Sequence, residues 1–303
     1  MPHRWTNLLQ EHGVVTLDGG LATELERDGA QLDNPLWSGI ILRSQPELIR
    51  QCHQSYFEAG AQVATTASYQ LTHEGMRATA LKTEEFDRLI ELSIRLAREA
   101  SRGEGLVAGS VGPYGAMLND GSEYTGDYEV GVEALSEFHR PRIKALVEGG
   151  VDVIALETFP SLREAQAAVE VVFEAGSVPC WVSFTCRDAG TTAAGESLRQ
   201  CAEVLSQYPQ VSAIGVNCVS PEVAIDAVAL LHESTDLPII AYPNSGERYD
   251  AGDGTWDDHP SDMTATQISR KLVQAGAHII GGCCRTDPSW ISAAREEYSR
   301  KLS

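Results

Sequence analysis

The middle of the chain contains the stretch Glu148-Gly-Gly150-Val-Asp-Val153-Ile-Ala-Leu-Glu157. The residues before it have helical period, and glycine suits the left-handed position at which helices commonly end. A Val- and Ile-rich run follows directly, as expected for a parallel strand that is buried on both faces. The same form, in which glycine ends a helix and a strand follows, recurs at 58–63 and 274–279. The stretch therefore predicts a repeated helix-to-strand unit with short turns.

Eight apolar runs of this kind alternate with helical stretches, one of them predicted over 46–58 from Pro46 onward. The predicted strands are 14–18, 62–66, 106–111, 151–157, 180–186, 211–217, 238–243 and 278–282. Eightfold strand–helix alternation is typical of a (β/α)8 barrel, whereas an open doubly wound sheet usually has about five to seven strands. We therefore predict an α/β fold, a single TIM-type barrel domain over residues 1–303.

The predicted strand-to-helix connections are longer than the helix-to-strand turns. Four long ones, at 19–44, 67–82, 112–128 and 244–263, open at the carboxyl ends of strands. Barrels of this kind build their active sites from the loops at that face. Residues that carry chemistry are therefore expected in these loops and at the strand ends beside them.

Composition excludes several classes of protein. The 303 residues include 23 basic and 43 acidic side chains, for a formal net charge of −20. Nucleic acids and anionic membranes need basic patches, so neither is an expected partner, and no obligate protein partner is evident. No run approaches the roughly 18 apolar residues of a membrane span, and no signal-peptide core follows the start, which together predict a cytoplasmic protein. Seven cysteines are too dilute for a disulfide framework and indicate packing, metal binding or catalysis.

Three cysteines are expected to converge at one rim of the barrel. Cys283 and Cys284 follow two glycines at the end of the last predicted strand. Cys218 ends another predicted strand, which comes two strands earlier in the chain. Neighbouring side chains on a regular strand point to opposite faces, so both members of the pair can face one site only where the strand ends. Three thiolates suit Zn²⁺ and leave a fourth tetrahedral position for a substrate. The alternatives are a buried cysteine pair and a vicinal disulfide.

The other cysteines and a nearby histidine give weaker signals. Cys186 ends a predicted strand and is the best candidate for a further thiol, although packing is the favoured interpretation. Cys52, Cys180 and Cys201 lie within helices or strands and are expected in the core. His278 lies at the opposite end of its strand, so a core or helix-facing role is favoured over metal ligation.

Two carboxylates are expected at the same rim. Asp18 ends the first predicted strand, before Gly19 and Gly20, whose N–H groups could receive a substrate carboxylate, and Glu157 ends the fourth. Burial of a carboxylate is costly without a partner such as a substrate ammonium group. The alternative for each is a structural ion pair or a hydrogen bond to the backbone of a loop. Together with a thiophilic metal, the two acids suit an amino acid that carries a thiol.

Several motifs carry a resemblance to one family. In chain order they are Leu17-Asp18-Gly19-Gly20, Thr65-Thr66-Ala67-Ser68-Tyr69-Gln70, Gly109-Ser110-Val111-Gly112-Pro113-Tyr114-Gly115, Glu157-Thr158, Gly215-Val216-Asn217-Cys218, Tyr242-Pro243-Asn244-Ser245-Gly246-Glu247-Arg248-Tyr249-Asp250 and Gly281-Gly282-Cys283-Cys284. They resemble the homocysteine S-methyltransferase family, and segment 242–250 resembles a signature of its S-methylmethionine-using branch. The resemblance runs from about residue 13 to residue 297.

The resemblance implies a zinc enzyme that forms methionine from homocysteine. Cys218, Cys283 and Cys284 would hold Zn²⁺, to which the homocysteine sulfur would bind. Asp18 and Glu157 would hold the ammonium group of homocysteine, and main chain near Gly19 its carboxylate. S-methylmethionine, or secondarily S-adenosylmethionine, would donate the methyl group. Direct transfer from a small sulfonium is favoured because one barrel leaves no module for folate or cobalamin.

Aromatic side chains in the long loops are candidates for contact with the cationic donor. Tyr69, Tyr114 and Trp256 could each offer a ring face to a sulfonium, and Asn244 could contact the polar end of the donor.

Three other functions stay open from the sequence. A selenocysteine methyltransferase could use the same scaffold, because selenols are already ionised at neutral pH. A non-catalytic zinc-binding protein needs the cysteines but neither carboxylate. A metal-free cysteine hydrolase needs a histidine within reach, and none of the eight histidines ends a predicted strand at this rim.

Overall fold

The structure is a computed structural model that describes residues 4–11, 13–32, 34, 36–79, 81–247, 249–250, 255–256 and 260–299. For 249–250, 255–256 and 297–299 only the main chain is described.

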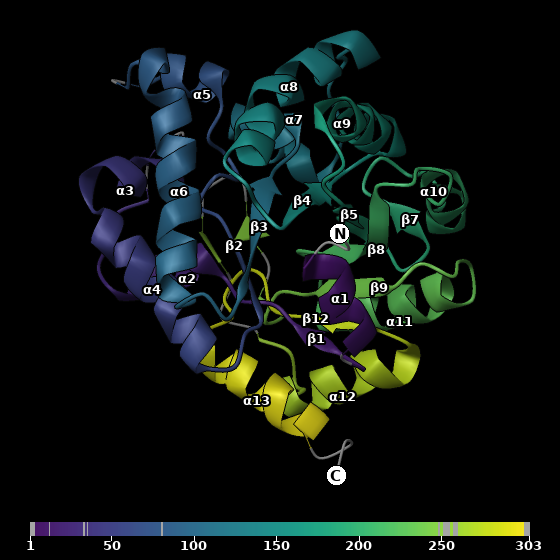
Figure 1. Cartoon of the computed structure of the whole chain (residues 1–303). Coiled ribbons are helices and arrows are strands. Elements are labelled where there is room, and N and C mark those ends of the chain that lie inside the picture. Colours follow the sequence, from purple (N-terminus) through teal and green to yellow (C-terminus); the bar gives the residue numbers. More distant parts are fainter. Residues whose placement is uncertain are drawn as a thin grey trace.

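Eight parallel strands form the centre of the molecule (Figure 1). They are β1 (Val15–Thr16), β2 (Val63–Thr65), β3 (Leu106–Val111), β4 (Val153–Phe159), β5 (Cys180–Phe184), β8 (Val211–Asn217), β9 (Ile239–Tyr242) and β12 (Ile279–Ile280). Their order in the sheet is β1-β12-β9-β8-β5-β4-β3-β2. A parallel bridge between Leu17, just after β1, and Val63 of β2 joins the two edges of the sheet. The predicted TIM-type barrel is confirmed. Several predicted boundaries are wrong by two residues: β1 ends at Thr16 rather than at Asp18, β4 covers Val153–Phe159 rather than 151–157, β5 ends at Phe184 rather than at Cys186, and β12 ends at Ile280 rather than at Gly282.

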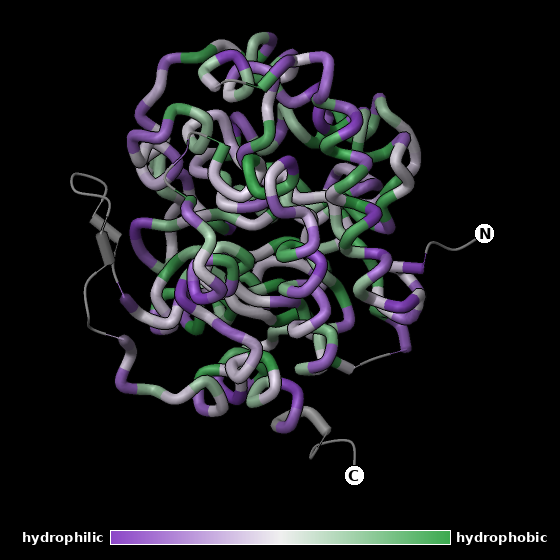
Figure 2. Tube along the Cα trace, turned by 90° about the vertical axis from the view of Figure 1, so that its left-hand side faces the viewer, coloured by the Kyte–Doolittle hydropathy of each residue, from purple (hydrophilic) through white to green (hydrophobic). Residues whose placement is uncertain are grey.

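Helices surround the barrel. Those on the outside are α4 (Pro46–Glu58), α6 (Phe86–Ala100), α8 (Val132–Glu148), α9 (Leu162–Ala175), α10 (Leu198–Leu205), α11 (Pro221–His232), α12 (Ala265–Ala275) and α13 (Pro288–Ser299). The predicted helix over 46–58 is confirmed. In Figure 2 the hydrophobic segments of the trace lie largely inside and the hydrophilic ones outside. None of the described helices combines the length and the apolar character needed to cross a membrane.

The long connections contain short elements of their own. They are α2 (Leu21–Arg27), α3 (Ser38–Ser44), α5 (His73–Arg77), η1 (Thr83–Glu85), α7 (Tyr114–Leu118), η2 (Ser122–Tyr124), and the hairpin strands β6 (Cys186–Asp188), β7 (Thr191–Thr192), β10 (Tyr249–Asp250) and β11 (Thr255–Trp256). All of them follow the carboxyl ends of barrel strands in the chain. The candidate site is therefore surrounded by structured segments rather than by bare loops.

The barrel interior changes from apolar to polar along β4 and β9. Val153 and Ala155 of β4 belong to the apolar cluster inside the barrel, and Glu157 follows with the same two-residue period. On β9, Ile240 and Tyr242 repeat this pattern, with the tyrosine hydroxyl at the carboxyl end. The alternation thus carries polar groups into the interior at the carboxyl end, where a site can form.

Helix α1 (Arg4–Glu11) contacts the amino ends of the strands. The Trp5 side chain is fully buried, and its ring centroid lies 5.4 Å from that of Trp181 near the start of β5. The Trp5 Nε1–H donates to Ser212 Oγ at 2.8 Å, near the start of β8. This helix therefore closes the end of the barrel that is opposite to the candidate site.

Replacement of Trp5 by alanine is expected to lower the free energy of unfolding by about 3–5 kcal/mol, because it leaves a cavity among buried side chains. Urea unfolding at equilibrium measures this change. Phe173→Ala is the matched control, because Phe173 is 59% exposed and its loss should change stability by less than about 0.5 kcal/mol. Equal effects of the two changes would contradict the packing role of Trp5.

Candidate active site

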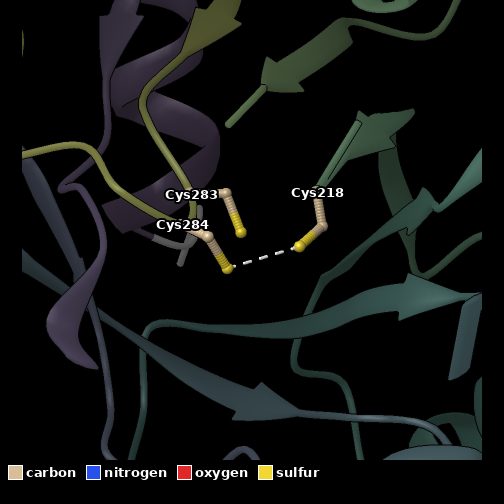
Figure 3. Close-up of side chains that lie close together, drawn as sticks. All are labelled: Cys218, Cys283 and Cys284. Atoms are coloured by element: carbon tan, nitrogen blue, oxygen red, sulfur yellow. Dashed lines mark hydrogen bonds between the residues drawn. The ribbon is translucent and has the colours of Figure 1, made fainter. Parts of the chain in front are cut away.

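Three cysteine sulfur atoms meet at the carboxyl end of the barrel. Cys218 directly follows β8, and Cys283 and Cys284 follow β12. The three Sγ atoms all lie within 4.8 Å of one another, and those of Cys218 and Cys284 are 3.6 Å apart (Figure 3). All seven cysteines of the chain carry free thiols, so the vicinal disulfide considered above is not present.

The main chain of β9 brings the two cysteine segments together. The Cys218 N–H donates to Tyr242 O at 3.3 Å, and the Cys283 N–H donates to Pro243 O at 2.8 Å. Because β9 lies between β8 and β12 in the sheet, its last residues anchor both segments. Cys218 has a φ of +55°, a conformation that costs a non-glycine residue free energy and is common at functional sites.

Glycine is required directly before the cysteine pair. A Cβ atom on Gly282 would lie 2.2 Å from the Thr286 hydroxyl oxygen. That hydroxyl donates to Cys283 O at 2.7 Å and accepts from the Gly20 N–H at 3.1 Å. The turn after β12 is thus tied to the loop after β1, which also begins at this rim.

The three thiols form one coupled electrostatic group. Hydrogen bonds from Cys283 and Cys284 lower the pKa of the Cys218 thiol well below its usual range. The interaction with an ionised Cys218 in turn raises the pKa of Cys283 and of Cys284. One thiolate is therefore favoured, and full ionisation of all three needs a compensating cation.

The geometry of the cluster fits a zinc ion. Tetrahedral coordination with Zn–S bonds of about 2.3 Å separates the sulfur atoms by about 3.8 Å. The observed 3.6 Å between Cys218 and Cys284, and the 4.8 Å limit for the three, are close to this separation. Among the described residues, no histidine or carboxylate joins the three cysteines as a further ligand. The donor set of soft thiolates thus matches zinc and leaves one position without a protein ligand.

Glu157 lies in the barrel interior with hydrogen-bond donors on both oxygens. Its Oε1 accepts from the Ser110 hydroxyl, and its Oε2 accepts from the Tyr242 hydroxyl at 3.1 Å. Burial raises the pKa of Glu157 to about 7. No ion pair joins Glu157 to another described residue, and both hydrogen-bond donors are side chains of barrel strands rather than the loop backbone that the structural alternative requires.

Asp18 is buried at the same rim. Its Oδ2 accepts from the Thr65 N–H at 2.8 Å and from the Thr65 hydroxyl at 3.2 Å. Burial and, to a smaller extent, the charge of Glu157 raise the pKa of Asp18 to about 8. The two carboxyl groups therefore lie in each other's field, in a place where a cation would stabilise the ionised form of both.

The glycines after Asp18 differ in what they can offer a ligand. The Gly20 N–H already donates to Thr286, to O at 3.2 Å and to Oγ1 at 3.1 Å. The Gly19 N–H has no acceptor among the described residues. The expectation of two free amide donors is therefore reduced to one, that of Gly19.

The candidate donor-binding residues have different neighbours. Tyr69 is partly buried, with its ring centroid 6.2 Å from that of Trp37, whereas the ring of Tyr114 packs 5.0 Å from Phe138. The Asn244 Oδ1 accepts the Cys284 N–H at 3.1 Å, so this side chain holds the cysteine segment. The side chain of Trp256 lies outside the described residues.

Several residues of the site were not predicted. The Tyr124 hydroxyl lies 3.5 Å from Cys218 Sγ, and Asn217 Nδ2 donates to Cys283 Sγ at 3.9 Å. Asn217 Oδ1 accepts from the Thr158 N–H and from Ser183 Oγ, both at 2.8 Å. Asn217 had a usable signal, because it ends a strand directly before Cys218. Tyr124 and Trp37 had none, since only the folded loops bring them to the site.

The fold and the site define a TIM-barrel protein with a cluster of three thiols at the catalytic face. The homocysteine S-methyltransferase family matches residues 15–298. The chain belongs to this family, and the predicted enzyme class, homocysteine S-methyltransferase, is confirmed.

Similar proteins cover nearly the whole chain. Homocysteine S-methyltransferase of Escherichia coli is 46% identical, with 95% of this chain and 96% of that protein covered. Homocysteine S-methyltransferase 3 of Zea mays is 42% identical, with 93% and 89% covered. The crystal structure of the metallated form of the Escherichia coli homocysteine methyltransferase MmuM has a TM-score of 0.87 and 42% identity, with 96% of this chain and 98% of that chain covered.

Proposed function

We propose that the enzyme transfers a methyl group from S-methylmethionine, or from S-adenosylmethionine, to homocysteine and that it requires zinc. The observation that carries the proposal is the cluster of three thiols at the open end of the barrel, with sulfur spacing suited to zinc. The metallated state named for the similar Escherichia coli structure supports it. We also propose that residues 1–303 form one domain and that the enzyme works in the cytoplasm.

Cys218, Cys283 and Cys284 hold the zinc ion in this proposal. When bound, zinc lowers the pKa of the homocysteine thiol, which is about 8.5 for a free thiol, and fixes the position of its sulfur. Two asparagines hold the cysteine segment in position: the Asn244 side chain accepts the Cys284 N–H, and Asn217 contacts Cys283 Sγ. These contacts keep the sulfur atoms in place before a substrate arrives.

Asp18, Glu157 and Gly19 hold the amino-acid end of homocysteine. Asp18 and Glu157 receive its ammonium group, which supplies the cation that the two buried carboxyls lack in the free protein. The Gly19 N–H receives its carboxylate. Three fixed attachments for one small molecule direct its sulfur toward the cysteine cluster.

The donor meets the thiolate of homocysteine in line. The thiolate electron pair forms the new S–C bond, and the electron pair of the old S–C bond stays on the donor sulfur, which becomes a neutral thioether. No general base is needed in this step, so positioning contributes much of the rate. Tyr69, with Trp37 beside it, offers aromatic surface to the sulfonium.

Removal of zinc with a chelator is expected to abolish methionine formation from homocysteine and S-methylmethionine, and Zn²⁺ should restore it. The reason is that little homocysteine is ionised at neutral pH without the metal. The rate is measured before chelation, after it and after addition of either Zn²⁺ or Mg²⁺, with Mg²⁺ as the control ion. An unchanged rate in the zinc-free protein would contradict the zinc requirement.

Two control reactions identify the substrates. Selenocysteine in competition with homocysteine shows which acceptor is preferred, and S-adenosylmethionine in place of S-methylmethionine shows which donor is preferred. A zinc-loaded protein that turns over none of these combinations would contradict the proposed function and favour a non-catalytic zinc-binding role.

A further inference from the structure

Glu123 lies in η2, in the long connection between β3 and α8. The next residue, Tyr124, places its hydroxyl 3.5 Å from Cys218 Sγ, so this turn borders the cysteine cluster. Glu123 Oε2 is fully buried and has no hydrogen-bond partner. Glu123 also forms no ion pair with another described residue. The carboxylate thus borders the site with one oxygen unsatisfied, in contrast to Asp18 and Glu157.

A buried carboxylate oxygen without a partner is destabilising. Burial and, to a smaller extent, the nearby Cys218 raise the pKa of Glu123 to about 7. The negative charge of Glu123 in turn raises the pKa of the Tyr69 phenol, after burial the next largest cause. The charge of Glu123 is therefore felt at both Tyr69 and Cys218. In the proposed function, Tyr69 faces the sulfonium and Cys218 holds the zinc ion.

The turn that carries Glu123 is held in place. A Cβ atom on Gly115 would lie 2.5 Å from the Glu123 N atom, so α7 packs directly against the main chain of η2. The Gly126 N–H donates to Ser122 O at 2.8 Å, and the Ser122 N–H donates to Asp120 Oδ1 at 3.0 Å. The unsatisfied oxygen thus belongs to a packed turn rather than to a loose segment, and a bound cation is the missing partner that its charge requires.

We propose that Glu123 is the counter-ion of the donor sulfonium and sets the preference of the enzyme for cationic methyl donors. This inference rests on the proposed function. The sulfonium is positive before transfer and neutral afterwards, because the donor sulfur keeps the electron pair of the broken S–C bond. The attraction to Glu123 is therefore strongest in the bound donor and decreases as the methyl group leaves. Loss of the charge should weaken donor binding more than it slows the chemical step.

The test compares two ligands of matched shape on the zinc-loaded protein without homocysteine. S-methylmethionine carries the sulfonium, and 2-amino-5-methylhexanoic acid has a neutral CH group in place of the sulfonium sulfur. Dissociation constants are measured by calorimetry for the wild type, for Glu123→Gln and for Glu129→Gln. Glu129 is an exposed residue of the same connection, so its variant is the matched control.

Glu123→Gln is expected to weaken binding of S-methylmethionine at least tenfold and to change binding of the neutral analogue less than twofold. The KM for the donor should rise by a similar factor, with kcat within about threefold of wild type and with zinc content unchanged. Glu129→Gln should behave as wild type.

Equal weakening for both ligands would indicate a structural role and overturn the inference, as would an unchanged affinity for S-methylmethionine. Glu123→Asp distinguishes charge from shape, because it should retain most of the preference for the cationic ligand. Failure of this inference is separable from failure of the proposed function, since the latter appears as absent turnover in the wild type.

Discussion

Cys218→Ser is expected to abolish methionine formation and to lower zinc binding sharply. Loss of a residue that only hydrogen-bonds to a metal ligand typically lowers metal affinity or activity by about 10–100-fold. Loss of a ligand itself should therefore lower zinc affinity and activity by more than about 100-fold. The strained conformation and high burial of Cys218 leave its sulfur fixed toward the other two cysteines. Cys283→Ser and Cys284→Ser should have effects of similar size. Turnover by the coupled reaction and zinc content by elemental analysis measure both properties.

The matched control for these changes is Cys186→Ser. Cys186 lies in the short hairpin after β5 and packs against the core, outside the cluster. Its variant should keep both its zinc and most of its activity. Full activity of Cys218→Ser at wild-type zinc content would contradict the assigned role of the cluster.

Glu157→Gln and Asp18→Asn are each expected to raise the KM for homocysteine by about 10–150-fold. Each change removes a charge-assisted hydrogen bond of about 1.5–3 kcal/mol to the substrate ammonium group while it preserves the size of the side chain. Steady-state kinetics with homocysteine as the varied substrate measure the effect. Glu148→Gln is the control, because Glu148 is an exposed residue at the end of α8, before the amino end of β4. An unchanged KM in both site variants would contradict the proposed binding mode.

The pH dependence of homocysteine binding follows from the same carboxyls. Their pKa values of about 8 and about 7 mean that both are largely protonated in the free protein at pH 6. An ammonium group needs the ionised forms, so the KM for homocysteine should fall as the pH rises from 6 to 8. In Glu157→Gln this fall should be shallower, because one of the two titrating groups is absent. A KM that rises over this range would contradict the assignment.

Much of the fold was predictable because its signal is local. Each barrel strand is an apolar run, and glycines such as Gly150 and Gly276 mark the helix-to-strand turns. The convergence of the cysteines was predictable for a similar reason, since parallel strands in a barrel end at one rim. The error at Cys186 shows the limit: the run 180–186 continues in the sequence, but a hairpin replaces the strand after Phe184.

The details of the site depend on contacts between distant parts of the chain. The Gly20 N–H is occupied by Thr286, which is 266 residues away, and the sequence gives no sign of this pairing. The long connections bring three further residues to the site: Trp37, Glu123 and Tyr124. No periodic pattern in such a connection predicts where a side chain points. Asn244 has a predicted place at the site, but its hydrogen bond to Cys284 depends on the register of β9 beside β12.

X-ray absorption at the zinc edge, with and without homocysteine, tests the central claim most directly. In the proposed site the three cysteines should supply three sulfur ligands at about 2.3 Å. Addition of homocysteine should replace one lighter ligand and raise the number of sulfur ligands to four. Coordination that homocysteine leaves unchanged, in protein that turns over with the same zinc content, would contradict the claim that the substrate thiol binds at this cluster.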